Sequence, residues 1–145
     1  MKPSEPCLLD SSVLIQGQRD PQWFSQKLAG MKDVATCHAS VGEYAVGMYA
    51  AAEKKTRDEA RAFYKEFTSS VARHPHLPDD FDEAARLIGE AIFSNKAKPS
   101  FPDGLIAACA RRLNRIVWTK DEGHFQAMGC GTFNPSEHPS GELAA

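Results

Sequence analysis

Short apolar runs that alternate with longer helix-like segments constrain the fold of this sequence most strongly. The runs are too short for buried helices, and the segments between them carry apolar side chains at intervals of three or four residues. Strands that alternate with amphipathic helices are typical of a parallel sheet with helices on both faces. We therefore expect an α/β fold, a three-layer α/β/α sandwich around a mainly parallel sheet of four to five strands. The expected strands are 7–9, 34–37, 115–119 and 131–134, with a further short strand near 74–78.

The segments between these strands predict helices over 21–31, 40–53 and 100–114. Two further helices are expected to begin near Thr56, with Glu59 completing a capping box, and near Asp80. Neither internal repeats nor a linker interrupt the pattern. We expect a single domain over residues 1–135 and a flexible tail over 136–145.

Composition is that of an ordinary soluble globular chain, with 145 residues, 42% hydrophobic and 25% charged. No apolar run approaches the roughly 20 residues that a membrane helix needs, and the N-terminus lacks a signal-like apolar core, so we expect a cytoplasmic protein with no membrane partner. The four cysteines form no CxxC pair, which argues against a zinc site. A net charge of −2 argues against a dedicated nucleic-acid binder, so a phosphate-binding surface would be local or would depend on a cation.

Four acidic residues are predicted to lie at one edge of the sheet. Ligands of such folds bind beyond the carboxyl ends of the strands, and Asp10 ends the first strand. Glu43 and Asp103 lie in the expected first turns of helices, and Asp121 follows the strand 115–119. The helix from Asp103 travels about 15 Å and the returning strand about 16 Å, so Asp103 and Asp121 should reach the same edge.

Each of these acids also has a purely structural interpretation. Glu43 and Asp103 both stand three residues after a serine, the spacing of a capping box, and Asp10 and Asp121 could be a helix cap and a turn residue. Four acids on one edge are harder to explain as four separate caps. Like charges at close range raise one another's pKa, and a divalent cation relieves the repulsion. Carboxylate oxygens suit Mg²⁺ or Mn²⁺, which indicates metal-assisted hydrolysis of a phosphodiester.

At these acids the sequence resembles PIN-domain ribonucleases, in particular the VapC-type toxins of bacterial toxin–antitoxin pairs. Four stretches match the family's sequence blocks in order: LLDSSVLI at 8–15, ASVGEYAVG at 39–47, PDGLIAACA at 102–110 and VWTKDEGHF at 117–125. The family's four acids fall on Asp10, Glu43, Asp103 and Asp121, and its accompanying hydroxyl falls on Ser12.

The resemblance implies an endoribonuclease that depends on Mg²⁺, with Mn²⁺ able to substitute. The four acids would hold the metal directly or through water, and Ser12 would orient a carboxylate or a metal-bound water. The bound metal would activate a water that attacks phosphorus, leaving a 5′-phosphate and a 3′-hydroxyl. The partners implied are an RNA substrate, a cognate antitoxin protein and a second copy of the chain in a homodimer. Gly104 departs from the family, in which alanine is usual at this position.

Two other functions compete with this interpretation. A signalling receiver domain also gathers acids around Mg²⁺, but it needs a phospho-accepting aspartate in its middle strand, and 71–78 holds no acid. A PIN fold that has become a catalytically silent module binding RNA or protein, or a nuclease that is not a toxin, is the stronger alternative.

Basic and aromatic residues around the expected site are given mainly structural roles. We expect Arg111, Arg112 and Arg115 to complement the end of their helix, and His124 to be a turn residue. Lys120, next to the last acid, is the better candidate for phosphate contact. Of the remainder, the basic run at 54–61 is expected to be a solvated face and Trp118 a core residue.

Overall fold

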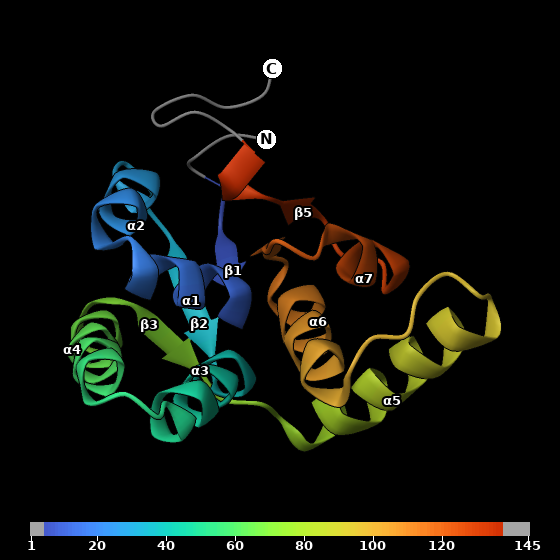
Figure 1. Ribbon diagram of the computed structural model, residues 1–145. Helices are drawn as coiled ribbons and strands as arrows, with labels where there is room; N and C mark the ends of the chain where they lie inside the picture. Colours follow the sequence, from blue (N-terminus) through green and yellow to red (C-terminus); the bar gives the residue numbers. More distant parts are fainter. Residues whose placement is uncertain (1–4, 138–145) are drawn as a thin grey trace.

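A five-stranded parallel sheet forms the centre of the computed structural model, which describes residues 5–137 (Figure 1). The strands are β1 (Cys7–Leu9), β2 (Val34–Cys37), β3 (Ala72–His74), β4 (Ile116–Trp118) and β5 (Thr132–Phe133). The helices are α1 (Ser11–Arg19), α2 (Pro21–Leu28), α3 (His38–Ala50), α4 (Lys54–Ser70), α5 (Pro78–Phe93), α6 (Phe101–Leu113) and α7 (Glu122–Ala127). A short 3-10 turn follows at Pro135–Glu137, so that 138–145 of the expected tail lie outside the described residues.

The strand order β3-β2-β1-β4-β5 confirms the expected α/β/α sandwich and makes its sheet parallel throughout. The chain moves outward from β1 to β3 on one side and then returns to add β4 and β5 on the other side. In open parallel sheets, ligands bind beyond the carboxyl ends of the strands where this direction reverses. Here that point lies between β1 and β4, directly beyond Leu9 and Trp118.

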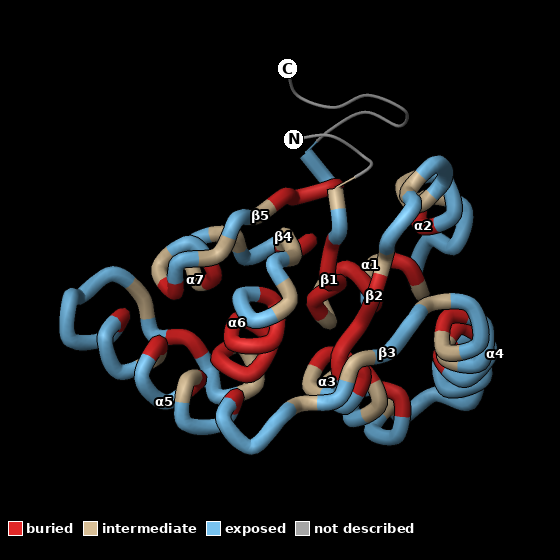
Figure 2. The backbone as a smooth tube through the Cα atoms, turned by 180° about the vertical axis from the view of Figure 1, so that it is seen from behind, coloured by how far each residue is buried: buried red, intermediate tan, exposed pale blue. Residues whose placement is uncertain are grey.

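Alternating side chains of β1 supply two separate hydrophobic cores, one on each face of the sheet. Cys7 and Leu9 join the core made with α1 to α4, and Leu8 joins the core made with α5 to α7. In Figure 2 the buried residues gather on β1, β2 and α6, whereas most of α5 is exposed. Trp118 is buried, as expected for a core residue. Burial on both faces explains why the central strands are apolar without interruption.

Several helix boundaries differ from the expectations. The capping box expected at Thr56 is wrong, because α4 begins two residues earlier and its N-cap is Glu53. The helix α3 begins at His38 rather than Ser40, which places Glu43 in its second turn and removes the expected capping box there. The helix α7 was expected only as a turn. Each boundary moves because tertiary packing, rather than the cap residue, decides where a helix starts.

Close packing of α5 against α6 accounts for glycine at position 104. A Cβ atom on Gly104 would lie 2.5 Å from Cδ1 of Ile88 and 3.1 Å from Cβ of Ala84, inside ordinary contact distance. The isoleucine on α5 thus occupies the space that an alanine methyl group would need. The departure from the family at this position is a packing adjustment between the two helices, and it leaves the neighbouring Asp103 in place.

The three arginines near the end of α6 have structural roles, as expected, but through other elements than their own helix. Arg112 forms a salt bridge of 3.0 Å with the buried Asp80 at the start of α5. Arg115 pairs with Asp33 at 2.8 Å and also donates to the backbone oxygen of Cys7. Arg111 donates to the backbone oxygen of Gly129 at 2.9 Å. The contacts of Arg111 and Arg115 lie where β5 and β2 begin, at the edge opposite the acids, whereas Arg112 joins α6 to the start of α5.

The basic run at the start of α4 is exposed, as expected, with Lys54 and Lys55 paired to acids one turn later. Across residues 5–137, no helix combines the length and the apolar character needed to cross a lipid bilayer.

Candidate metal centre

Asp10 stands at the carboxyl end of β1 with only 3% of its surface exposed. Its Oδ2 accepts hydrogen bonds from Oγ1 of Thr119 at 2.8 Å and Oγ of Ser12 at 2.9 Å. Its Oδ1 is buried and has no hydrogen-bond partner among the described residues. Although Asp10 occupies the N-cap position of α1, its side chain makes no capping hydrogen bond. The helix-cap interpretation is thus confirmed for the position of Asp10 but not for its side chain, whose buried Oδ1 is left without a hydrogen-bond partner.

Glu43 and Asp103 bring two further carboxylates to Asp10 from opposite sides of the sheet edge. Glu43 comes from α3 and accepts a hydrogen bond of 3.1 Å from Oγ of Ser11. Asp103 comes from the first turn of α6, where it forms the expected capping box with Ser100. One oxygen of each of the three acids lies within 4.8 Å of the others. We call Asp10, Glu43 and Asp103 the acid cluster.

Asp121, the fourth predicted acid, is outside the acid cluster. It is exposed at the N-cap of α7, and its backbone N–H donates to Oγ1 of Thr119 at 2.9 Å. Comparing the length of the helix from Asp103 with that of the returning strand therefore predicted the correct edge for both segments. The carboxylate of Asp121 nevertheless stays outside the cluster, because α7 begins directly after this residue.

Electrostatics make the acid cluster unfavourable without a counterion. Burial raises the pKa of Glu43 to about 7, and the negative charges of Asp10 and Asp103 add to this shift while the hydroxyl of Ser11 opposes it. Burial also raises the pKa of Asp10, against the lowering effect of the Thr119 and Ser12 hydroxyls. Both shifts show that the charged carboxylates are disfavoured in the metal-free protein. A bound cation would stabilise their charged forms.

The donor set fits a hard divalent cation. Three carboxylates converge from the end of β1, from α3 and from α6, no cysteine or histidine belongs to this set, and Oδ1 of Asp10 is buried without a partner. Oxygen ligands with room for water suit Mg²⁺ or Mn²⁺ rather than zinc. The residues present therefore fit the metal that the sequence predicted.

Three residues around the acid cluster had no predicted part in it. Thr119 fixes Asp10, and the only signal in the sequence was a hydroxyl at the end of the strand beside β1. Ser11 fixes Glu43 and was visible as the first hydroxyl of the DSS triplet. His124, expected in a turn, lies on α7 with Nδ1 3.4 Å from Oδ2 of Asp103.

Ser12 lies where the resemblance placed it, next to Asp10. Besides donating to Asp10, its Oγ accepts a hydrogen bond of 3.1 Å from the backbone N–H of Lys120. Ser12 thereby connects the backbone between β4 and α7 to Asp10, the residue that follows β1. The side chain of Lys120 is exposed beside the cluster.

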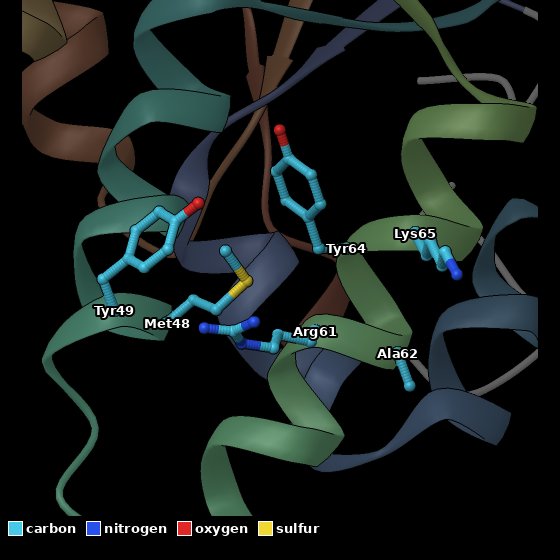
Figure 3. Close-up of a pocket in the computed structure, with 6 residues that line it drawn as sticks. All are labelled: Met48, Tyr49, Arg61, Ala62, Tyr64 and Lys65. Carbon is cyan, nitrogen blue, oxygen red and sulfur yellow. The ribbon is translucent and has the colours of Figure 1, made fainter.

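A pocket elsewhere in the molecule has a different character. Figure 3 shows it between α3 and α4, lined by Met48, Tyr49, Arg61, Ala62, Tyr64 and Lys65. None of these residues is acidic, and the guanidinium of Arg61 lies 5.8 Å from the ring centre of Tyr49. The metal chemistry therefore belongs to the sheet edge and not to this pocket.

Comparison with known families identifies the fold. The model of the family described as "PIN domain" matches residues 7–129, which include every residue of the acid cluster. The chain belongs to the PIN domain family. PIN domains are generally nucleases, which agrees with a carboxylate cluster at the sheet edge. The strand order also excludes a receiver domain, whose order is 2-1-3-4-5.

Several solved structures share this fold over about nine tenths of the chain. FitAcB from Neisseria gonorrhoeae is 24% identical with a TM-score of 0.73, and the match covers 91% of this chain and 99% of that one. VapBC-5 from Mycobacterium tuberculosis, a member of the VapBC family of toxin-antitoxin systems, is 25% identical with a TM-score of 0.67, covering 89% and 96%. DNA-bound VapBC from Salmonella typhimurium is 13% identical with a TM-score of 0.76, covering 90% and 98%. Among curated proteins, none matches this chain.

Proposed function

We propose that the protein is a Mg²⁺-dependent endoribonuclease that hydrolyses RNA phosphodiesters. The observation that carries this proposal is the acid cluster, in which one carboxylate oxygen of each acid lies within 4.8 Å of the others and Oδ1 of Asp10 is buried without a hydrogen-bond partner. In a family of nucleases, such a site has the ligands that a divalent cation requires. Mn²⁺ offers the same coordination chemistry and is expected to substitute for Mg²⁺.

The acids and the hydroxyls have different roles at the site. When bound, the cation would supply an activated water and would neutralise the charge that develops on the scissile phosphate. Asp10, Glu43 and Asp103 would hold it, and the Ser12 and Thr119 hydroxyls keep Asp10 in one orientation.

Glu43 and Asp121 differ from the other two acids. Because its pKa is raised to about 7, Glu43 is about half protonated near neutral pH in the metal-free protein, and it would lose the remaining proton on binding the cation. Asp121, exposed at the start of α7, would reach the metal through a water.

We further propose that the protein is the toxin of a toxin–antitoxin pair. Its support is the likeness to VapBC-5, which is described as a member of such a system. An antitoxin segment would inhibit the enzyme by covering the acid cluster, with a cationic side chain among the carboxylates. A homodimer and a cytoplasmic location complete this proposal. The alternatives are a non-toxin PIN nuclease and a catalytically silent PIN module that binds RNA or protein.

RNA cleavage by the purified protein with Mg²⁺ or Mn²⁺ tests the proposed activity. The comparison includes Asp10→Asn, Asp103→Asn and a control, Asp58→Asn, which changes an exposed acid on α4. We expect the wild type and the control to cleave, and both site variants to lose at least about 100-fold in rate. Unchanged cleavage in both site variants would overturn the assignment. Growth arrest on expression of the wild type, absent in the variants, would separate a toxin from a housekeeping nuclease.

A further inference from the structure

Two exposed phenylalanine rings lie at the starts of α5 and α6, the second of which is the helix that supplies Asp103 to the acid cluster. Phe101 is the first residue of α6 and precedes Asp103 by two residues, about 3 Å along the helix axis. Phe81, near the start of α5, has its ring centre 6.2 Å from that of Phe101, with the two planes inclined by 37°. Phe81 is 47% exposed and Phe101 is 45% exposed. We call these two residues the aromatic shelf.

The shelf is held in place by buried neighbours. The ring of His76 meets that of Phe81 nearly edge-on, with centres 6.4 Å apart and planes at 76°. Nε2 of His76 accepts a hydrogen bond of 3.0 Å from the backbone N–H of Ala39, which fixes the imidazole. Exposed rings that are already oriented lose little conformational freedom on binding, so the shelf is suited to a planar ligand.

The row of rings continues toward the other helix that carries a cluster acid. The ring centre of His38, the first residue of α3, lies 6.4 Å from that of His76. Nε of the exposed Arg73 donates a hydrogen bond of 2.7 Å to Nδ1 of His38, which places a positive charge at this end. Glu43 follows His38 by five residues on α3. The row therefore connects the starts of α3 and α6, the same helices that supply Glu43 and Asp103.

Figure 1 shows these helix starts together at the edge toward which the arrowheads of β1 and β2 point. An RNA strand whose phosphate lies at the acid cluster must pass along this edge. Aromatic rings beside a phosphate site are typical of single-strand recognition, because every base offers a face on which a ring can stack.

We propose that Phe81 and Phe101 stack against the bases of single-stranded RNA next to the cleaved phosphate. This inference rests on the proposed function, whose metal centre sets the position of the cleaved bond. The shelf would select unpaired over paired RNA, since a base inside a helix presents its faces to neighbouring bases. Arg73 at the far end of the row would contact a phosphate of the same strand.

Binding of a short unstructured RNA that carries 2-aminopurine tests the shelf without requiring cleavage. Base stacking quenches the fluorescence of this base, and the titration is done with wild type, Phe81→Leu, Phe101→Leu and Phe93→Leu. Leucine keeps an apolar side chain but removes the ring. Phe93 is the matched control, since it is 92% exposed on α5 but lies 12 residues beyond Phe81, about 18 Å along the axis.

We expect Phe81→Leu and Phe101→Leu each to weaken RNA binding by about tenfold and to reduce the quenching, with Phe93→Leu unchanged. Replacing the stacked nucleotide by an abasic one should weaken binding to the wild type by a similar factor, but should have little effect on the shelf variants. An abasic penalty that is the same in wild type and shelf variants would overturn the shelf. The shelf would also be overturned if its variants bind RNA normally but sediment as monomers where the wild type sediments as a dimer. The two rings would then form a contact between two copies of the chain.

Cleavage measured in parallel separates this inference from the proposed function. If the RNA is bound with base-dependent quenching but is never cut with Mg²⁺, the shelf is supported and the proposed activity is wrong. If the RNA is cut and KM is the same for wild type and both shelf variants, the activity is supported and the shelf is wrong.

Discussion

Asp10 shows at the scale of one residue why a carboxylate can interrupt an apolar stretch. Its Oδ2 is held by two hydroxyls, while its buried Oδ1 has no partner among residues 5–137. Burying a charge with an unpaired oxygen is costly, and a bound cation removes that cost. The stability of this protein is therefore expected to depend on metal.

Addition of Mg²⁺ should raise the melting temperature of the wild type and leave that of Asp10→Asn unchanged. A ligand that binds only the folded state stabilises it by about 2.7 kcal/mol at a concentration of 100 Kd. Differential scanning calorimetry in EDTA and in excess Mg²⁺ measures both shifts. Equal shifts in the two proteins would show that the cation binds elsewhere.

The raised pKa of Glu43 predicts a pH dependence of stability in the metal-free protein. The folded protein keeps the Glu43 proton up to a pKa of about 7, whereas the unfolded chain loses it near the ordinary glutamate pKa of 4.5. Between these values the folded state binds more protons, so the free energy of unfolding falls as pH rises through this window. We expect a loss on the order of 2 kcal/mol, allowing for partial exposure of the side chain.

Denaturant unfolding in EDTA at about pH 5 and about pH 8 measures this loss. Glu43→Gln should show a smaller decrease than the wild type, because the amide does not titrate. A wild type that becomes more stable over the same range would contradict the assigned shift.

At the scale of elements, the packing of α5 on α6 decides whether Asp103 is held correctly. Gly104→Ala places a methyl group against Ile88 and Ala84, and we expect it to cost about 1–3 kcal/mol of stability. The control is Gly89→Ala on the exposed face of α5, where a Cβ meets nothing within 4 Å and should stabilise the helix by about 0.5–1 kcal/mol. Urea unfolding compares the two, and partial rescue of Gly104→Ala by Ile88→Ala would identify the contact as the cause.

The Arg112–Asp80 salt bridge links the end of α6 to the start of α5. Arg112→Ala leaves the charge of Asp80 buried without its partner, so we expect a loss of about 3 kcal/mol in the free energy of unfolding. Arg86→Ala, which removes an exposed pair with Glu90 on α5, should cost less than about 1 kcal/mol. If Arg112 instead contacts RNA, the stability of its variant will be close to that of the wild type and its RNA affinity will be lower.

The sequence was sufficient to predict the elements but not all of their boundaries. The strands β1 and β2 match the predicted limits, because an apolar run between polar residues marks a buried strand on its own. The capping box at Ser100 and Asp103 is also confirmed, since both partners are local. Glu43 and Asp121 were placed less accurately, because the starts of α3 and α7 depend on packing between distant segments. Thr119 was missed for the same reason, as its partner Asp10 is 109 residues away.

At the scale of the whole molecule, the strand order determines where chemistry can occur. The order in which strands are added to the sheet reverses at β1. The carboxyl ends of β1 and β4 therefore lie side by side, at the edge where α3 and α6 begin. Three carboxylates from separate segments meet there, and two exposed rings lie together at the starts of α5 and α6. A metal, an RNA backbone and its bases would thus be bound side by side. All of these functions require that the acid cluster binds the cation.

Electron paramagnetic resonance measures Mn²⁺ binding by wild type, Asp10→Asn, Asp103→Asn and the control Asp58→Asn. We expect wild type and control to bind Mn²⁺ alike and each site variant to lose at least about tenfold in affinity. Equal Mn²⁺ binding by all four proteins, or no binding by the wild type, would contradict this expectation.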